Sequence, residues 1–251
     1  MIIFKNVSKK FQDNIIYEDL NLTINDAESL VIIGQSGVGK SVLLKHIIGL
    51  MLPDSGSVIV DNANIEKTTG NKLLEIRKKF GFVFQGGALF DSMNVKENIS
   101  LALREHTKLN EKEINKKVAE KLELVGLAGT ENLMPVELSG GMRKRVSIAR
   151  AIVMDPAYIL YDEPTTGLDP ILAQRINQLI VNLNEHLKVT GIVVTHDIAS
   201  AYAIASRIAM LFKGKIIFTG TPDEASKSNN PYVNQFLKGN IEGPIIIGEK
   251  N

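Results

Sequence analysis

The segment Gly34-Gln35-Ser36-Gly37-Val38-Gly39-Lys40-Ser41 has the spacing G-x-x-x-x-G-K-[ST] of a phosphate-binding P-loop. Glycines at these positions let the backbone curl around an anion with no Cβ in the way. The loop amides and the dipole of the helix that follows then supply positive potential. The pattern predicts that Lys40 reaches the β- and γ-phosphates of a nucleotide and that the Ser41 hydroxyl coordinates Mg²⁺.

The sequence on both sides of this loop supports the same interpretation. The run Leu30-Val31-Ile32-Ile33 is apolar throughout, as expected of a buried parallel strand. After the loop, apolar residues recur at helical spacing, namely Leu43, Leu44, Ile47, Ile48 and Met51. A strand, a glycine loop and a helix in this order form the setting that a P-loop requires, so a chance match is disfavoured.

The composition bounds the class of protein. The chain has 251 residues, of which 44% are hydrophobic and 23% are charged, with a formal net charge of +1 and no cysteine. These values are typical of one large α/β domain or of a core with a subdomain. They give no indication of general nucleic-acid binding, and they exclude disulfides and thiolate metal sites.

No targeting or membrane segment is expected. Strand-like sequence begins directly at Ile2, so we expect no signal peptide. No apolar run reaches the roughly 18 residues that a membrane span needs. Any work at a membrane is therefore expected to depend on a partner.

Two more apolar runs end in side chains suited to nucleotide chemistry. The run from Tyr158 ends in Asp162, the expected Mg²⁺-orienting residue of a Walker B strand, and in Glu163, which is placed to polarise a water molecule. The run from Gly191 ends in His196, which is either a γ-phosphate contact or a structural histidine.

Phe11 and one basic helix leave alternatives open. Phe11 is either a core residue, which is favoured, or a platform for an adenine ring. Ser139 is expected to cap a helix that runs through Arg150, whose N-terminus could face an anion. The basic residues of this helix form either a solvated face, which is favoured, or a nucleic-acid patch: Arg143, Lys144, Arg145 and Arg150.

Other segments predict the surrounding architecture. Residues 94–126 have helical periodicity with two capping patterns, and we expect them to belong to an inserted helical subdomain. The apolar, glycine-bearing loop at 86–90 predicts a docking surface or a mobile joint. A hairpin is expected at 207–218, and Ile245, Ile246 and Ile247 in the polar tail are expected to need cover from another subunit.

With these motifs in order, the chain resembles the ATP-binding cassette (ABC) family over nearly its whole length. The match comprises the aromatic Phe11, the P-loop, the Q-loop residue Gln85, a signature at 138–142, the Walker B pair, a D-loop at 167–169 and the switch residue His196. The signature departs from the family pattern in one residue, Met142, where glutamine is usual.

Three local features further resemble the Mla/Mce lipid-transport branch of this family. They are the segment 84–92, the methionine of the signature, and a tail with Gly239 and Glu242-Gly243-Pro244. That branch is associated with moving phospholipids or other hydrophobic molecules between the membranes of diderm bacteria.

The resemblance implies a fold and a division of the chain. We expect an α/β P-loop NTPase with a RecA-like core, an antiparallel β subdomain and an inserted helical subdomain. The ABC ATPase domain would span 1–238, with the helical insertion at about 92–150, and the tail 239–251 would contact a partner in a dimer. Two copies would enclose two ATP molecules, so that Ser139, Gly140 and Gly141 of one copy meet the γ-phosphate held by Lys40 of the other.

The resemblance also implies roles and partners. Ser41, Asp162 and Gln85 would hold Mg²⁺, Glu163 would act on the attacking water, and His196 would steady the γ-phosphate. Gln85 and the loop behind it would lie against a membrane permease at the cytoplasmic face of the inner membrane. A Mce-type substrate-binding protein and a small STAS-type subunit are further expected partners, and nucleic acid is not.

Other functions fit the same residues less well. An importer for amino acids or ions remains open, because cargo is chosen by subunits outside this chain. A non-transport ABC protein on ribosomes or DNA usually has two cassettes or a long coiled-coil insertion, and neither is present. A GTPase would need an Asn-Lys-x-Asp motif, which is absent.

Overall fold

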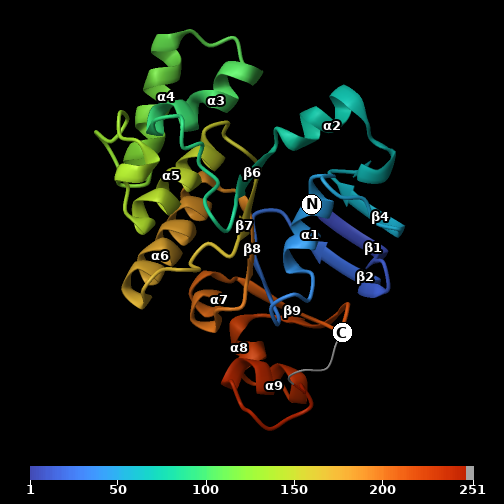
Figure 1. The fold of residues 1–251 in the computed structure, drawn as a ribbon. Coiled ribbons are helices and arrows are strands. Elements are labelled where there is room, and N and C mark those ends of the chain that lie inside the picture. Colours follow the sequence, from blue (N-terminus) through green and yellow to red (C-terminus); the bar gives the residue numbers. More distant parts are fainter. Residues whose placement is uncertain (247–251) are drawn as a thin grey trace. The chain divides into compact units, whose positions relative to one another are not determined.

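The computed structural model describes residues 1–246. They divide into two compact units, one made of residues 1–76 together with the described residues from Ile192 onward, the other of Arg77–Gly191. Figure 1 labels their elements. Each unit is described by itself below. The predicted division into 1–238 and 239–251 stays a prediction.

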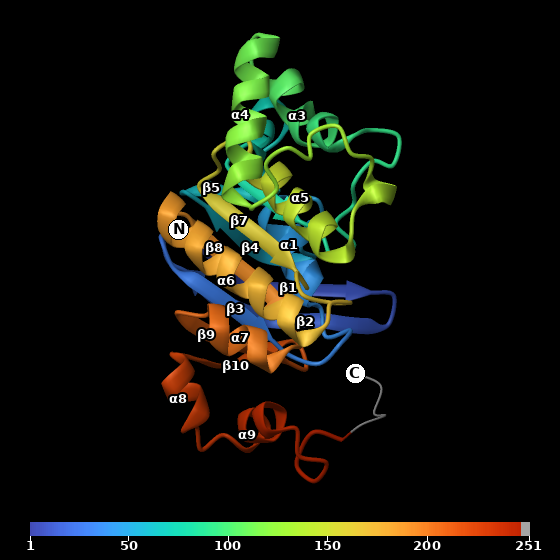
Figure 2. The same ribbon diagram turned by 90° about the vertical axis from the view of Figure 1, so that its left-hand side faces the viewer.

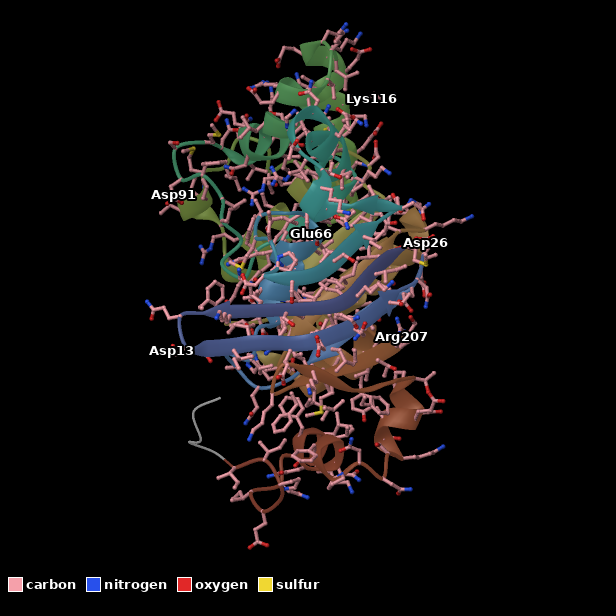
Figure 3. All side chains as sticks on the ribbon, turned by 90° about the vertical axis from the view of Figure 1, so that its right-hand side faces the viewer. Asp13, Asp26, Glu66, Asp91, Lys116 and Arg207 are labelled. Atoms are coloured by element: carbon pink, nitrogen blue, oxygen red, sulfur yellow. The ribbon has the colours of Figure 1, made fainter. Side chains whose placement is uncertain are left out.

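The first unit contains an antiparallel sheet of four strands in the order β2-β1-β4-β5. The strands are β1 (Ile2–Phe11), β2 (Asn14–Ile24), β4 (Ser55–Val60) and β5 (Ala63–Asn64). Ile2 pairs with both Ile24 and Val60, and all three side chains are fully buried. Figure 3 shows Asp13 at the turn between β1 and β2 and Asp26 after the far end of β2. The predicted antiparallel β subdomain is therefore confirmed.

The same unit contains three strands that carry the P-loop. β3 (Ser29–Ile33) runs parallel to β9 (Arg207–Phe212), which pairs antiparallel with β10 (Lys215–Gly220). The hairpin predicted at 207–218 is confirmed. It turns at Lys213 and Gly214, whose φ angles of 42° and 75° fit a two-residue turn with the twist of the flanking strands.

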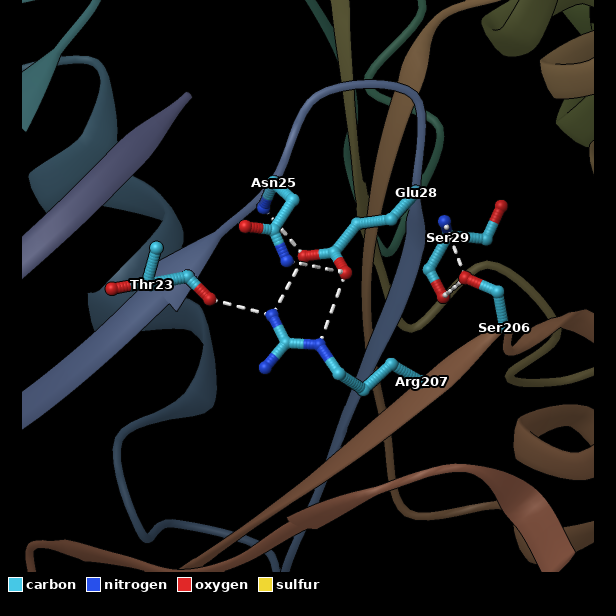
Figure 4. Close-up of polar contacts among 6 residues, drawn as sticks. All are labelled: Thr23, Asn25, Glu28, Ser29, Ser206 and Arg207. Atoms are coloured by element: carbon cyan, nitrogen blue, oxygen red, sulfur yellow. Dashed lines mark hydrogen bonds and ion pairs between the residues drawn. The ribbon is translucent and has the colours of Figure 1, made fainter.

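An ion pair fixes β9 against the turn between β2 and β3 (Figure 4). The Arg207 guanidinium donates to both carboxylate oxygens of Glu28, at 3.0 and 2.7 Å, and also to the Thr23 carbonyl. The Ser206 hydroxyl accepts from the Ser29 amide at 3.0 Å. Two-point contacts between Arg and a carboxylate set geometry as well as energy, so β3 enters the sheet in a fixed position.

The helices of this unit are α1 (Lys40–Ile47), α2 (Gly70–Arg77, whose last residue belongs to the other unit), α7 (Ile198–Ile204), α8 (Pro222–Ser226) and α9 (Pro231–Lys238), with a 3₁₀ turn at Ile65–Lys67. α1 follows the P-loop and buries Leu43, Leu44 and Ile47 as predicted. Thr221 caps α8, since its side chain and that of Glu224 exchange hydrogen bonds with each other's amides.

The tail is held by α9 of its own chain. The Gln235 side chain donates to the Ile245 carbonyl at 3.1 Å and accepts from the Ile245 amide at 2.6 Å. Ile245 is 6% exposed as a result, so the expectation that it needs cover from another subunit is wrong. A glutamine offers both a donor and an acceptor, which satisfies this backbone group completely. Ile246 is 62% exposed, and Ile247 lies outside the described residues.

The second unit pairs β6 (Phe80–Val83) parallel with β7 (Tyr158–Asp162). Its helices are α3 (Val95–His106), α4 (Glu111–Leu124), α5 (Gly140–Ile152) and α6 (Pro170–Leu187), with a 3₁₀ turn at Pro135–Glu137. β8 (Thr190–Thr195) starts in this unit and ends in the first. Figure 2 shows α3 and α4 as neighbours.

The predicted helical region at 94–126 is confirmed. Asn94 and Asn110 form capping boxes with Glu97 and Glu113 at the starts of α3 and α4. The apolar stripe of α4 is buried, namely Ile114, Val118, Leu122 and Val125. Among residues 1–246, no helix has both the length and the apolar character needed to cross a bilayer.

Candidate functional site

The P-loop connects β3 to α1 in the first unit. Gly34 has φ 156°, and a Cβ there would lie 2.4 Å from the Leu211 carbonyl oxygen, so only glycine permits this approach to β9. The Lys40 ammonium folds over the loop and donates to the carbonyls of Gly34 and Gln35 at 2.8 and 2.9 Å. Lys40 is 5% exposed, which places a positive charge inside the loop as the motif predicts.

Strand β2 supports the P-loop from behind. Gly39, the N-cap of α1, has φ 105°, and a Cβ there would lie 2.5 Å from Ile16 Cγ2 and 3.1 Å from the Tyr17 oxygen. The Tyr17 hydroxyl donates to the Gly39 carbonyl, which also accepts the first helical bond of α1 from the Leu43 amide at 3.1 Å. Burial raises the pKa of Tyr17, so the hydroxyl keeps its proton.

His46 extends this contact to the far end of α1. Its ring lies 5.9 Å from the Tyr17 ring, and Nδ1 is 2.8 Å from the Met51 carbonyl oxygen. The side chain is fully buried, and within residues 1–246 its Nε2 has no hydrogen-bond partner. Burial lowers the pKa of His46, which favours the neutral ring with the proton on Nδ1. Tyr17 therefore contacts both ends of the helix whose N-terminus would face phosphate.

We predict that Tyr17→Phe weakens nucleotide binding by up to about fivefold, because one net hydrogen bond contributes about 1 kcal/mol. The chain offers a matched control in Tyr161→Phe, which removes another buried hydroxyl, bonded to Asn184 at 3.2 Å in the second unit. Titration of both variants with a fluorescent ATP analogue should show a loss of affinity only for Tyr17→Phe. Equal affinities in the two variants would contradict a role of Tyr17 in P-loop geometry.

Asp162 and Glu163 lie at the end of β7 in the second unit, each 8% exposed. Glu163 has φ 48°, a left-handed conformation that is unfavourable for a residue with a Cβ. The Thr166 hydroxyl donates to its carboxylate at 3.3 Å, and the Thr166 amide donates to its carbonyl at 3.3 Å. Strain of this kind accumulates at functional sites, which agrees with the predicted role of Glu163.

The signature lies at the start of α5. The Ser139 hydroxyl accepts from the Met142 amide at 3.2 Å, so the predicted cap is confirmed. Methionine in place of glutamine leaves this bond unchanged, because the donor is a backbone amide. Gly140 and Gly141 follow, and a Cβ on either would meet only side-chain carbons of Leu168 and Leu172, at 3.7 Å.

Two of the four basic residues of α5, Lys144 and Arg150, are not part of a solvated face, whereas Arg143 is exposed as expected. Lys144 is 7% exposed and its ammonium donates to the Gln85 carbonyl, while Arg150 donates to the Gly87 and Ala88 carbonyls at 2.7 Å each. Arg143 donates to the Leu138 carbonyl at 2.6 Å. Both sequence alternatives, the solvated face and the nucleic-acid patch, are therefore wrong for Lys144 and Arg150. Their guanidinium and ammonium groups satisfy backbone carbonyls that the loop after β6 leaves without partners in the sheet.

Burial also changes the acid–base behaviour of these groups. It lowers the pKa of the Lys144 ammonium, and the negative charges of Glu163 and then Asp162 raise it in part. Burial likewise lowers the pKa of Arg150. Lys144 therefore binds the Gln85 backbone within electrostatic range of the Asp162 and Glu163 carboxylates, an arrangement that sequence reasoning missed because lysine is rarely buried.

The remaining predicted residues are placed as follows. Phe11 ends β1 and is 42% exposed, with the Lys9 ammonium 5.4 Å from its ring centre, so the favoured core alternative is wrong. His196 follows β8 and is exposed, as is the side chain of Gln85 after β6. The first unit thus holds Phe11, the P-loop and His196, and the second holds Gln85, 139–141 and the Walker B pair.

A glycine loop between a parallel strand and a helix, with a buried lysine folded over it, defines a P-loop NTPase. The family model described as ABC transporter matches residues 17–166, and the chain belongs to this family. The predicted fold class is confirmed with it.

Relatives span nearly the whole chain. The probable ribonucleotide transport ATP-binding protein mkl of Mycobacterium tuberculosis is 46% identical over 244 residues, which cover 97% of this chain and 68% of that protein. The intermembrane phospholipid transport system ATP-binding protein MlaF of Haemophilus influenzae is 43% identical over 98% of this chain and 93% of its own length. A dimeric post-hydrolysis structure of the ATP-binding cassette MJ0796, bound to ADP and Pi, is 36% identical with a TM-score of 0.80 and covers 88% of this chain and 98% of that one.

Proposed function

We propose that the chain is the ATP-hydrolysing subunit of an ABC transport complex that moves phospholipid or another hydrophobic molecule between membranes. The observations that carry the hydrolytic part are a buried Lys40 folded over the P-loop in the first unit and, separately, a strained, buried Glu163 at the end of β7 in the second. One supplies positive charge to phosphate, and the other is suited to act on water.

The reaction is attack of water on the γ-phosphate of ATP, which breaks the bond to the β-phosphate oxygen and releases ADP and inorganic phosphate. Lys40 and the loop amides neutralise phosphate charge, and Glu163 accepts a proton from the attacking water. His196 contacts the γ-phosphate, and Phe11, exposed at the end of β1, offers a face for the adenine ring. The signature of a second copy, through Ser139, Gly140 and Gly141, completes the site.

The proposed Mg²⁺ ligands fit a hard cation. Ser41 offers a hydroxyl, Gln85 an amide oxygen and Asp162 a carboxylate, and oxygen donors of this kind suit Mg²⁺. When bound, the ion neutralises charge that develops on the phosphates. The described residues that would hold it lie at the start of α1, after β6 and at the end of β7.

The names of the relatives support two cargoes. Mkl is named for ribonucleotide transport, and MlaF for phospholipid transport. Phospholipid is favoured because MlaF matches this chain over 93% of its own length, compared with 68% for Mkl, and because the segment 84–92 and the methionine signature resemble the lipid-transport branch. Transport of another solute is the second candidate.

The proposed assembly has two copies of this chain on a membrane permease, at the cytoplasmic face of the inner membrane. The dimeric MJ0796 cassette supports the pairing of copies. A Mce-type substrate-binding protein and a STAS-type subunit complete the proposal. Phe84 and Phe90, 39% and 49% exposed on the loop after β6, are suited to contact the permease.

The test is an affinity purification of the tagged chain from solubilised native membranes, followed by protein and lipid mass spectrometry. We expect a multi-span permease, a single-span Mce-type protein and bound phospholipid. Phe90→Asp should lose the permease, whereas Val136→Asp, which changes an 88% exposed apolar side chain of the same unit, should retain it. Recovery of a soluble solute-binding protein without enriched lipid would overturn the cargo.

A further inference from the structure

The loop after β6 follows one face of α5. Lys144, Ser147 and Arg150 are spaced three residues apart, which places them in one row along the helix. Lys144 binds the Gln85 carbonyl, a Cβ on Gly87 would lie 3.8 Å from Ser147 Cβ, and Arg150 binds the carbonyls of Gly87 and Ala88. The backbone from 85 to 88 is thus held at successive positions of this row.

The conformation of the loop shows that these contacts are needed. Gly87 and Ala88 have φ angles of 78° and 47°. For a residue with a Cβ the left-handed conformation is unfavourable, and it persists only where the surroundings impose it. The two left-handed residues bring consecutive carbonyls to one guanidinium, at 2.7 Å each, so Arg150 stabilises the turn that the backbone itself disfavours.

The contacts use the backbone of Gln85 and leave its side chain available. The side chain is exposed, while the carbonyl is bound by a lysine that is 7% exposed. The same helix presents Ser139 at its N-terminus. Helix α5 therefore carries the signature at its N-terminus and also determines the path of the backbone at 85–88. That segment leads to the exposed Phe90 of the same loop.

We propose that Lys144 and Arg150 are positioning residues of the hydrolysis site, which hold the backbone of 85–88 on α5 and so fix where the Gln85 side chain is presented. The inference rests on the proposed function, in which Gln85 is a Mg²⁺ ligand. Neither side chain touches substrate in this role. Both act by limiting the freedom of the loop, and small misplacements of a site residue reduce turnover strongly.

A second buried lysine provides a control that separates the positioning role of Lys144 from a purely structural role. Lys121 in α4 is also 7% exposed and lies in the same unit, and its ammonium pairs with Asp155 at 2.5 Å. The same substitution can therefore be made at two lysines of equal exposure. Only one of them, Lys144, contacts the Gln85 backbone.

The experiment measures steady-state ATP hydrolysis by the purified full chain as a function of ATP and of Mg²⁺. We expect Lys144→Met to lower kcat about tenfold and to raise the Mg²⁺ concentration needed for half activity, with KM for ATP within about twofold, because the P-loop is unchanged. Lys144→Arg should restore most of kcat, since it keeps a charged donor. Lys121→Met should keep kcat although it lowers thermal stability.

A second variant covers the case in which Lys144→Met does not fold. Arg150→Lys keeps the charge but offers no planar fork for two carbonyls, and we expect it to lower kcat and raise the Mg²⁺ requirement in the same way. With an active wild type, two results would overturn the inference. One is a wild-type kcat and Mg²⁺ dependence in Lys144→Met or Arg150→Lys. The other is an equal fall in kcat for Lys144→Met and Lys121→Met. A wild-type chain that hydrolyses no ATP would overturn the proposed function as well.

Discussion

Glu163→Gln is expected to lower the rate of ATP hydrolysis by about 10²–10⁴, the range in which a general base contributes to catalysis. The substitution keeps the size of the side chain and its hydrogen bond from the Thr166 hydroxyl, observed at 3.3 Å, but removes the carboxylate that would accept a proton from water. ATP should still bind, because the P-loop in the first unit is untouched. The variant should therefore accumulate as an ATP-bound dimer, measurable by single-turnover hydrolysis and by light scattering.

Glu185→Gln is the matched control for this experiment. Glu185 is an exposed carboxylate of α6 in the same unit, so the same isosteric change removes the same charge away from β7. Hydrolysis at the wild-type rate is expected there. Wild-type turnover in Glu163→Gln would exclude Glu163 as the base and would leave the strained conformation at the end of β7 without a catalytic explanation.

Lys40→Ala is expected to weaken ATP binding by about 10- to 100-fold. A hydrogen bond from a charged donor contributes about 1.5–3 kcal/mol, and the ammonium already sits inside the loop, 2.8 and 2.9 Å from the carbonyls of Gly34 and Gln35. Removing it also leaves these carbonyls without their charged donor, so the loop itself should be less ordered. Isothermal titration with a non-hydrolysable ATP analogue measures the change.

Lys45→Ala separates the local effect from the change in net charge. Lys45 lies in the last turn of the same helix, so the variant has the same formal charge as Lys40→Ala but an intact loop. Its affinity should stay close to that of the wild type. An unchanged affinity in Lys40→Ala would contradict the assignment of residues 34–41 to phosphate binding.

Local patterns were sufficient to predict most elements of the fold. The P-loop with its strand and helix, the capping boxes at Asn94 and Asn110, and the hairpin at 207–218 all depend on residues close in sequence. Caps, glycine turns and apolar periodicity act over a few residues, so they can be recognised without knowing the fold. The resemblance to the ABC family then predicted how these local elements combine, because it rests on the order of the motifs along the chain.

Burial of polar and aromatic side chains could not be predicted in the same way. Phe11 was favoured as a core residue and is exposed, whereas Lys144 was favoured as solvated and is buried. Each outcome depends on what lies opposite in space. Phe11 pairs with Asn14 at the hairpin end of β1, beside the Lys9 ammonium, whereas Lys144 lies against the carbonyl of Gln85, a residue far along the chain. The expected external cover for Ile245 was wrong for the same reason, because Gln235 satisfies its backbone from α9.

The sequence by itself determined the phosphate-binding glycine loop at 34–41 and predicted the strand-end carboxylates Asp162 and Glu163, since residue types at short spacing specify that chemistry, and the order of its motifs resembled the ABC family. Tertiary structure decided how those motifs are supported: Tyr17 behind Gly39, Lys144 on the Gln85 carbonyl, and Arg150 on the left-handed turn at 87 and 88. The physical reason is that a motif's chemistry depends on residue types at short spacing. Its support depends on which buried donors and acceptors the fold brings together from distant segments.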